Sequence, residues 1–200
     1  MSLESAVARA LADLAGDRYD RGDAARVVPA SPGLYAFYGD ERAWAELGLS
    51  PVFDGQPLYI GKAEKSLNGR DVGTHFSTGK TGSSTVRRSL AALLVDRLGL
   101  VAVPRNRLRP DGSANYALDP ESDVRLTAWM EDRLTLATWQ KPTDVVLGDV
   151  ETAVLVSLRP PLNLDKVGEP RERLREARRA LAEASRVWAA DTSAPAYSGE

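Results

Sequence analysis

The sequence contains no cysteine and only one histidine, His75. Disulfide frameworks, thiolate or multi-histidine zinc sites and cysteine nucleophiles are therefore excluded. Any metal ion must be held mostly by oxygen ligands. That requirement favours Mg²⁺ or Mn²⁺, bound as one ion by one or two carboxylates together with water and substrate phosphates.

Long apolar runs are also lacking, because no segment approaches the roughly 20 apolar residues that cross a bilayer. The first residues do not combine a basic segment with an apolar core, as a secretion signal does. Charged residues make up 27% and hydrophobic residues 43% of the chain, which is ordinary for a globular protein. We therefore expect a cytoplasmic protein without a membrane partner.

Lysine is scarce, with 5 residues against 21 arginines, and the net charge is −2. The segment 60–110 nevertheless holds ten Lys or Arg against three acids, a local charge of +7. Such a segment predicts a phosphate-binding face, although solvated helix positions would give the same count. The candidates for nucleic-acid contact are Lys65, Lys80, Arg87, Arg88, Arg105 and Arg107.

Residues 57–76 contain four side chains suited to chemistry: Tyr59, Lys62, Arg70 and His75. An arginine offers a planar fork to phosphate oxygens, and histidine titrates near neutrality. Each also has an ordinary interpretation, since tyrosines on strands usually pack and an arginine at a helix start usually lies on the surface. The decision depends on whether other reactive groups converge on this segment.

Glu151 is such a group, because it shares a helical face with Leu147, Val154 and Leu155. A carboxylate on a core-facing stripe needs a partner, since an unpaired buried charge costs several kcal/mol. A metal ion or an arginine would satisfy it. Both alternatives remain open at this point.

Hydrophobic periodicity and turn residues predict the order of elements. We expect helices over 2–15, 41–47, 84–98, 119–132, 143–158 and from 169, strands over 33–38, 57–61 and 134–139, and loops over 16–24 and 101–118. Residues 1–168 form the expected main domain, 169–190 an added amphipathic helix, and 191–200 a flexible tail.

Residues 77–81, Ser-Thr-Gly-Lys-Thr, imitate the end of a phosphate-binding P-loop. The glycine required five positions before Gly79 is replaced by Thr74, and no hydrophobic strand precedes the run. We therefore expect no nucleotide cofactor.

One ordered set of residues resembles the GIY-YIG nuclease superfamily. The set comprises Gly33-Leu34-Tyr35, Tyr59-Ile60-Gly61-Lys62, Arg70, Glu151 and Asn163. The resemblance implies an α+β fold, with a small three-stranded antiparallel sheet flanked by helices, to which this chain adds N- and C-terminal helices. It also implies cleavage of phosphodiesters with one divalent metal ion.

The resemblance further implies roles for individual residues. Glu151 would ligate the metal, Arg70 would stabilise charge on the scissile phosphate, and Asn163 would orient the site. Tyr35 or Tyr59 would position or deprotonate the attacking water. Lys62 would hold a tyrosine in its reactive state. These five roles match what phosphoryl transfer needs.

Two features depart from the common pattern. Tyr35 and Tyr59 lie 24 positions apart because of an excursion over 39–56, a length more typical of the restriction-endonuclease-like branch. Many members carry His or Tyr four residues after the arginine, whereas here His75 follows Arg70 by five. A catalytic role for His75 is one hypothesis, and a hydrogen-bonded loop histidine is the other.

The sequence thus favours a metal-dependent DNA endonuclease in restriction, defence or repair. A nucleic-acid-binding module that keeps the fold without turnover is the alternative, and a structural adaptor that uses the last helix is a third hypothesis. A restriction role would favour a homodimer, because two-fold symmetric sites match two-fold symmetric proteins.

Overall fold

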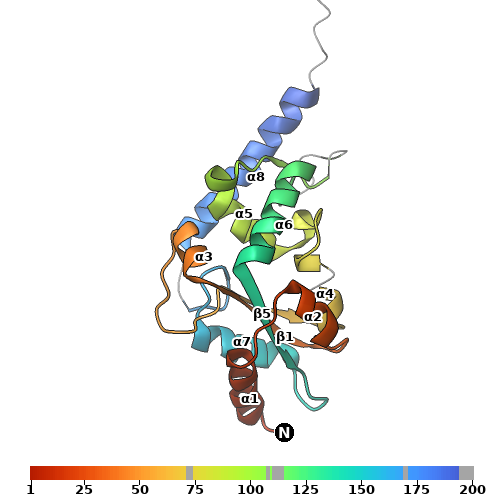
Figure 1. Ribbon diagram of the computed structural model, residues 1–200, viewed down its shortest axis with the longest axis vertical. Helices are drawn as coiled ribbons and strands as arrows, with labels where there is room; N and C mark the ends of the chain where they lie inside the picture. The colour runs from red at the N-terminus through yellow and green to blue at the C-terminus, as the bar shows by residue number, and fades with distance from the viewer. Residues whose placement is uncertain (71–73, 107–108, 110–114, 169–170, 194–200) are drawn as a thin grey trace, which may run out of the picture.

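A computed structural model describes the fold for residues 1–70, 74–106, 109, 115–168 and 171–193. A three-stranded antiparallel sheet lies at its centre in the order β2-β1-β5 (Figure 1). The strands are β1 (Gly33–Gly39), β2 (Tyr59–Ala63) and β5 (Leu134–Gln140). The predicted α+β fold with a small antiparallel sheet is confirmed.

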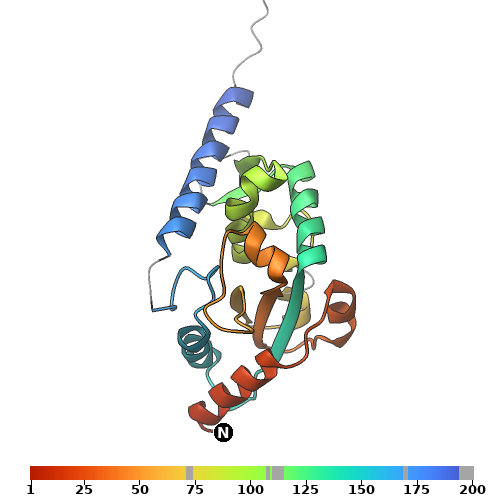
Figure 2. The ribbon, with the colours of Figure 1, turned by 60° about the vertical axis from the view of Figure 1, so that its left-hand side comes forward.

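Side chains alternate between the two faces of β1. Because nearly all of them are buried, both faces of the sheet are covered. Leu34, Ala36 and Tyr38 pack under α1 (Leu3–Ala15) and α7 (Leu147–Leu158). The opposite face carries Tyr35 and Phe37 and contacts the core of α5 (Thr85–Leu98) and α6 (Pro120–Arg133). In Figure 2 the sheet lies between these two groups of helices. The two faces therefore meet different helices.

The remaining elements are short, except for the last helix. They are α2 (Arg21–Val27), α3 (Glu41–Glu46), α4 (Leu67–Arg70), η2 (Thr81–Ser83), β3 (Ala102–Pro104), β4 (Tyr116–Leu118) and α8 (Glu172–Ser193).

Two segments differ from the predicted loops. Helix α2 begins within the expected loop 16–24, because the Asp20 side chain caps it by accepting from the backbone N–H of Asp23. The predicted irregular stretch 101–118 instead contributes β3 and β4, which pair antiparallel. Strands of three residues are too short for an alternation pattern to reveal.

Helix α8 lies alongside α5 and the β3-β4 pair, as both ribbon views show (Figures 1 and 2). Leu174, Leu181 and Ala182 form its buried contacts. It therefore packs against the helical end of the molecule and not over the central sheet. Within the part of the chain that is described, no helix is long and apolar enough to cross a membrane.

Candidate active site

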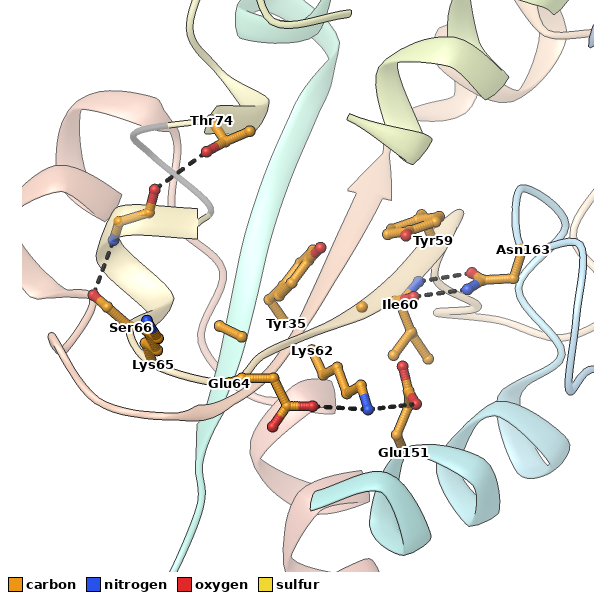
Figure 3. Close-up of a pocket in the computed structure, with 13 residues that line it drawn as sticks. Tyr35, Tyr59, Ile60, Lys62, Glu64, Lys65, Ser66, Thr74, Glu151 and Asn163 are labelled. Carbon is orange, nitrogen blue, oxygen red and sulfur yellow. Dashed lines mark hydrogen bonds and ion pairs between the residues drawn. The ribbon is translucent and has the colours of Figure 1, made fainter. Parts of the chain in front are cut away.

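A cavity of about 690 Å³ runs along the edge strand β2 (Figure 3). Its walls come from β1, β2, α7 and the segment after α7, which are far apart in the sequence. Five residues of the predicted site line it together: Tyr35, Tyr59, Lys62, Glu151 and Asn163. The edge of the sheet is therefore the place where chemistry can occur.

Tyr35 and His75 are joined by a buried hydrogen bond. The Tyr35 hydroxyl lies 2.6 Å from Nε2 of His75, and Nδ1 of His75 lies 2.7 Å from Oγ of Ser84. Ser84 is the N-cap residue of α5. The Tyr35 and His75 side chains are both buried, so the imidazole is anchored to a helix start and contacts the tyrosine that faces the cavity.

Two glycines allow this arrangement. Gly61 lies opposite Tyr35 in the β1-β2 register, and a Cβ there would lie 2.3 Å from the Tyr35 hydroxyl oxygen. At Gly33 a Cβ would lie 2.1 Å from the carbonyl oxygen of Trp139. Glycine is therefore required at both positions by close approach, and Gly61 leaves room for the tyrosine hydroxyl to reach the cavity and His75.

Glu151 extends from α7 toward the opposite side of β2, with its side chain 12% exposed. Its Oε2 lies 2.8 Å from Nζ of Lys166 and 3.8 Å from Nζ of Lys62. Lys62 also contacts Glu64 at 2.9 Å, so its ammonium bridges two carboxylates (Figure 3). The hydrogen bond to Glu64 raises the pKa of Lys62, partial burial opposes this rise, and the charge of Glu151 adds to it. Lys62 is therefore a cation at neutral pH.

Asn163 binds the outer edge of β2 as a neighbouring strand would. Its Oδ1 accepts from the backbone N–H of Ile60 at 2.9 Å, and its Nδ2 donates to the Ile60 carbonyl at 2.7 Å. The backbone N–H of Leu162 donates to the Leu58 carbonyl next to it. These bonds satisfy an exposed strand edge and hold β2 in place, a geometry that fits the orienting role implied for Asn163.

The structure corrects the prediction that Arg87 and Arg88 contact nucleic acid. Arg87 is fully buried, forms an ion pair with Asp123 and donates to the His75 carbonyl at 2.9 Å. Burial lowers the pKa of Arg87, and Asp123 opposes that effect. Arg88 is only 7% exposed and donates to the Gly82 carbonyl. Both guanidiniums are directed into the protein, because the helix that carries them is packed on all sides at its first turns.

Removing the Asp123 carboxylate is expected to destabilise the protein strongly. Asp123→Ala would leave the Arg87 charge buried and unpaired, at a cost of about 3–5 kcal/mol. Denaturant titration followed by circular dichroism measures this loss. The double variant Arg87→Met/Asp123→Leu removes both charges and is expected to regain most of the stability. A loss below about 1 kcal/mol for Asp123→Ala, typical of an exposed pair, would contradict this assignment.

The other basic candidates have different surroundings. Lys65 is exposed at the wall of the cavity, and Lys80 and Arg105 are exposed elsewhere. Arg107 and the side chain of Arg70 lie outside the described residues, although the backbone of Arg70 is the last residue of α4. Contacts of these residues with nucleic acid remain predictions.

Comparison with models of known protein families shows which family the chain belongs to. The family model described as GIY-YIG catalytic domain matches residues 54–180, which is more than half of the sequence. The chain belongs to the GIY-YIG family. Comparisons with curated proteins and with solved structures gave no match.

The GIY-YIG match includes β2, α4, Glu151 and Asn163, and it begins after β1. Tyr35 is connected to the matched region through the β1-β2 pairing, in which it lies opposite Gly61. The structure thus unites both halves of the GIY-YIG motif at one cavity.

GIY-YIG nucleases generally depend on a divalent metal ion, which needs oxygen ligands from the protein, water or the substrate. Within the described ranges no three His, Cys, Asp or Glu side chains gather as a complete metal site. Glu151 offers one carboxylate at the wall of an open cavity, and Glu64 lies across Lys62 from it. Mg²⁺ is commonly held by one or two carboxylates, with water and substrate phosphate as the other ligands. The site therefore fits a metal ion whose remaining ligands come from water and the substrate phosphate.

The sequence did not indicate that Lys166 contacts Glu151 or that Glu64 contacts Lys62. Lys166 lies in the loop after α7 with a positive φ of 64°, and nothing in its sequence context indicates a contact fifteen positions away. Glu64 follows β2 directly, where a charged residue ordinarily faces solvent. In this GIY-YIG site these two residues set the charge around the acid.

Proposed function

We propose that this protein is a Mg²⁺- or Mn²⁺-dependent endonuclease that hydrolyses DNA phosphodiester bonds in restriction, defence or repair. One observation carries the proposal: the Tyr35–His75 pair and Glu151 approach a single open cavity from opposite faces of β2. A proton acceptor and a metal-binding carboxylate on two sides of one cavity are the parts that phosphodiester hydrolysis requires.

Tyr35 is the better candidate of the two tyrosines for activating water, because its hydroxyl already has a proton acceptor. With Nδ1–H of His75 donating to Ser84, Nε2 accepts the Tyr35 proton; this tautomer is assigned from the hydrogen-bond network. The tyrosine oxygen then takes a proton from water as its own proton moves to His75. The single histidine therefore acts through Tyr35.

The reaction then balances as a hydrolysis. The water oxygen forms a bond to phosphorus, the bond from phosphorus to the leaving oxygen breaks, and the leaving oxygen takes a proton from solvent. Glu151 would hold the divalent ion, which when bound supplies Lewis-acid neutralisation of the phosphate charge. Lys62 places a cation beside the same carboxylate. Arg70 is proposed to stabilise the developing negative charge.

Incubation of the purified protein with supercoiled plasmid and Mg²⁺ or Mn²⁺, beside Glu151→Ala, tests this function. We expect nicked and linear products from the unaltered protein, no products with EDTA, and no products from Glu151→Ala. Agarose gels report all three results. Equal cleavage by the protein and by Glu151→Ala would contradict the site assignment.

The alternative is a nucleic-acid-binding module without turnover. One observation favours it: the Glu151 carboxylate already contacts two ammonium groups, from Lys62 and Lys166, as in a structural ion pair. A module would bind DNA with strong salt dependence and leave plasmid intact with either metal. The plasmid experiment therefore separates the two functions.

A further inference from the structure

A second cavity of about 380 Å³ adjoins the first one and shares Tyr59, Glu151 and Asn163 with it. Its other walls include Thr85 at the start of α5, Lys166 in the loop after α7, and Arg178 on α8, together with Leu155, Leu164 and Asp165. The C-terminal helix thus reaches the candidate active site.

Arg178 is a partly exposed cation at the wall of the second cavity. Within the described residues it forms no hydrogen bond and no ion pair shorter than 4 Å. Burial lowers its pKa, and the more distant groups of Tyr116, Tyr59 and Asp165 oppose that effect. The carboxylate of Asp165 is instead paired with Arg175 at 3.1 Å. The guanidinium of Arg178 is therefore available to an anion.

Arg88 places a second positive charge near this cavity, because its guanidinium donates to the hydroxyl of Thr85, which lines the cavity. Its Nε is buried without a hydrogen-bond partner, and no carboxylate of the described chain lies within ion-pair distance of it. Burial, followed by the nearby charge of Arg178, lowers the pKa of Arg88 to about 10. Two guanidiniums that repel each other create a positive potential, which a bound anion would relieve.

The positive surface continues along α8 beyond Arg178. A smaller cavity of about 250 Å³ is lined by the adjacent Arg178 and Arg179 and by Arg186, about two helical turns further along α8, together with Tyr116. Arg178 lines both cavities, so the cationic side chains follow one path away from Glu151. A path of this kind fits an extended polyanion better than a single small anion.

We propose that Arg178 and the second cavity bind the phosphate next to the scissile one, and that α8 tracks the same DNA strand away from the active site. This proposal rests on the function proposed above, because it takes Glu151 to mark the scissile phosphate. A guanidinium can donate two hydrogen bonds to the oxygens of one phosphodiester, whereas the compact ammonium of lysine acts as a point charge. Arg178 is thus a substrate-binding residue, and α8 is part of the nuclease surface.

Fluorescent duplex DNA titrated with the full chain in EDTA measures binding without cleavage. Arg178→Ala is expected to weaken binding about tenfold, as the loss of one charge-assisted contact does, and to reduce the slope of log K against log salt by about one. Arg9→Ala removes the same charge from the exposed side of α1 and is the matched control, expected to change affinity less than twofold. Arg178→Lys is expected to recover only part of the affinity.

Circular dichroism of each variant reports folding, which Arg178→Ala is expected to preserve because the side chain is partly exposed. An unchanged affinity for Arg178→Ala, or equal losses for Arg178→Ala and Arg9→Ala, would overturn the proposal. If the plasmid remains intact while Arg178→Ala still weakens DNA binding, the endonuclease assignment fails and the phosphate site stands. If plasmid is cut and Arg178→Ala binds normally, only the phosphate site fails.

Discussion

Tyr35→Phe is expected to lower the single-turnover rate of DNA cleavage by about 10²- to 10⁴-fold, the usual contribution of a positioned proton-transfer group. The substitution removes only the hydroxyl oxygen that lies 2.6 Å from His75. The ring and its packing against Phe37 are kept. Quenched mixing of excess protein with labelled DNA in Mg²⁺ measures the rate without contributions from product release.

Tyr38→Phe is the matched control for this loss. Tyr38 lies on the same strand, faces the opposite side of the sheet, and donates its hydroxyl to the Leu14 carbonyl at 2.7 Å. Removing the Tyr38 hydroxyl is expected to lower the free energy of unfolding by about 1 kcal/mol, as the loss of a single buried hydrogen bond does, and to leave the cleavage rate unchanged. Equal rates for the Tyr35 and Tyr38 variants would show that the Tyr35 hydroxyl takes no part in the chemistry.

Most elements of this fold could be predicted from local patterns because each strand of the central sheet and most helices carry their own signal. The aromatic alternation of 33–38 marks β1, and Ser84 with Gly99 marks the two ends of α5. The ordered motif residues were sufficient to indicate the family and its three-stranded sheet. The features that could be predicted are therefore those determined by residues close together in the sequence.

Long-range contacts could not be predicted in the same way. His75 contacts Tyr35 across forty positions, and its spacing from Arg70 gave no indication of that partner. Arg87 carries the charge of a surface residue but is buried, because Asp123 on another helix meets it. Lys166 reaches Glu151 from a loop. Each contact depends on how two elements pack, which residue type and periodicity do not encode.

The charge count of residues 60–110 shows the same limit. It predicted one phosphate-binding face, yet Arg87 and Arg88 are buried and Lys62 pairs with two carboxylates. Lys65 of this segment is exposed at the wall of the first cavity, whereas Arg178, which lines the adjoining cavity, lies on a helix outside the counted segment. A linear count cannot distinguish cations that neutralise internal acids from cations that remain available to a substrate.

Glu151→Gln is expected to reduce cleavage more than any other single change on α7. The amide keeps the size of the side chain but loses the charge that would hold the divalent ion, and several kcal/mol of charge stabilisation are lost with it. At a tenfold rate change per 1.4 kcal/mol, this corresponds to about 10³-fold. Asp149→Asn is the matched control, since it removes the same charge from an exposed position on the same helix.

The most direct measurement is the single-turnover rate at saturating DNA in Mg²⁺ for the unaltered protein, Glu151→Gln and Asp149→Asn, purified in parallel. Saturation removes differences in affinity, so the rates report the chemical step alone. The account predicts a loss of about 10³-fold for Glu151→Gln and an unchanged rate for Asp149→Asn. Cleavage by Glu151→Gln at the rate of the unaltered protein would contradict the claim that this cavity is the active site.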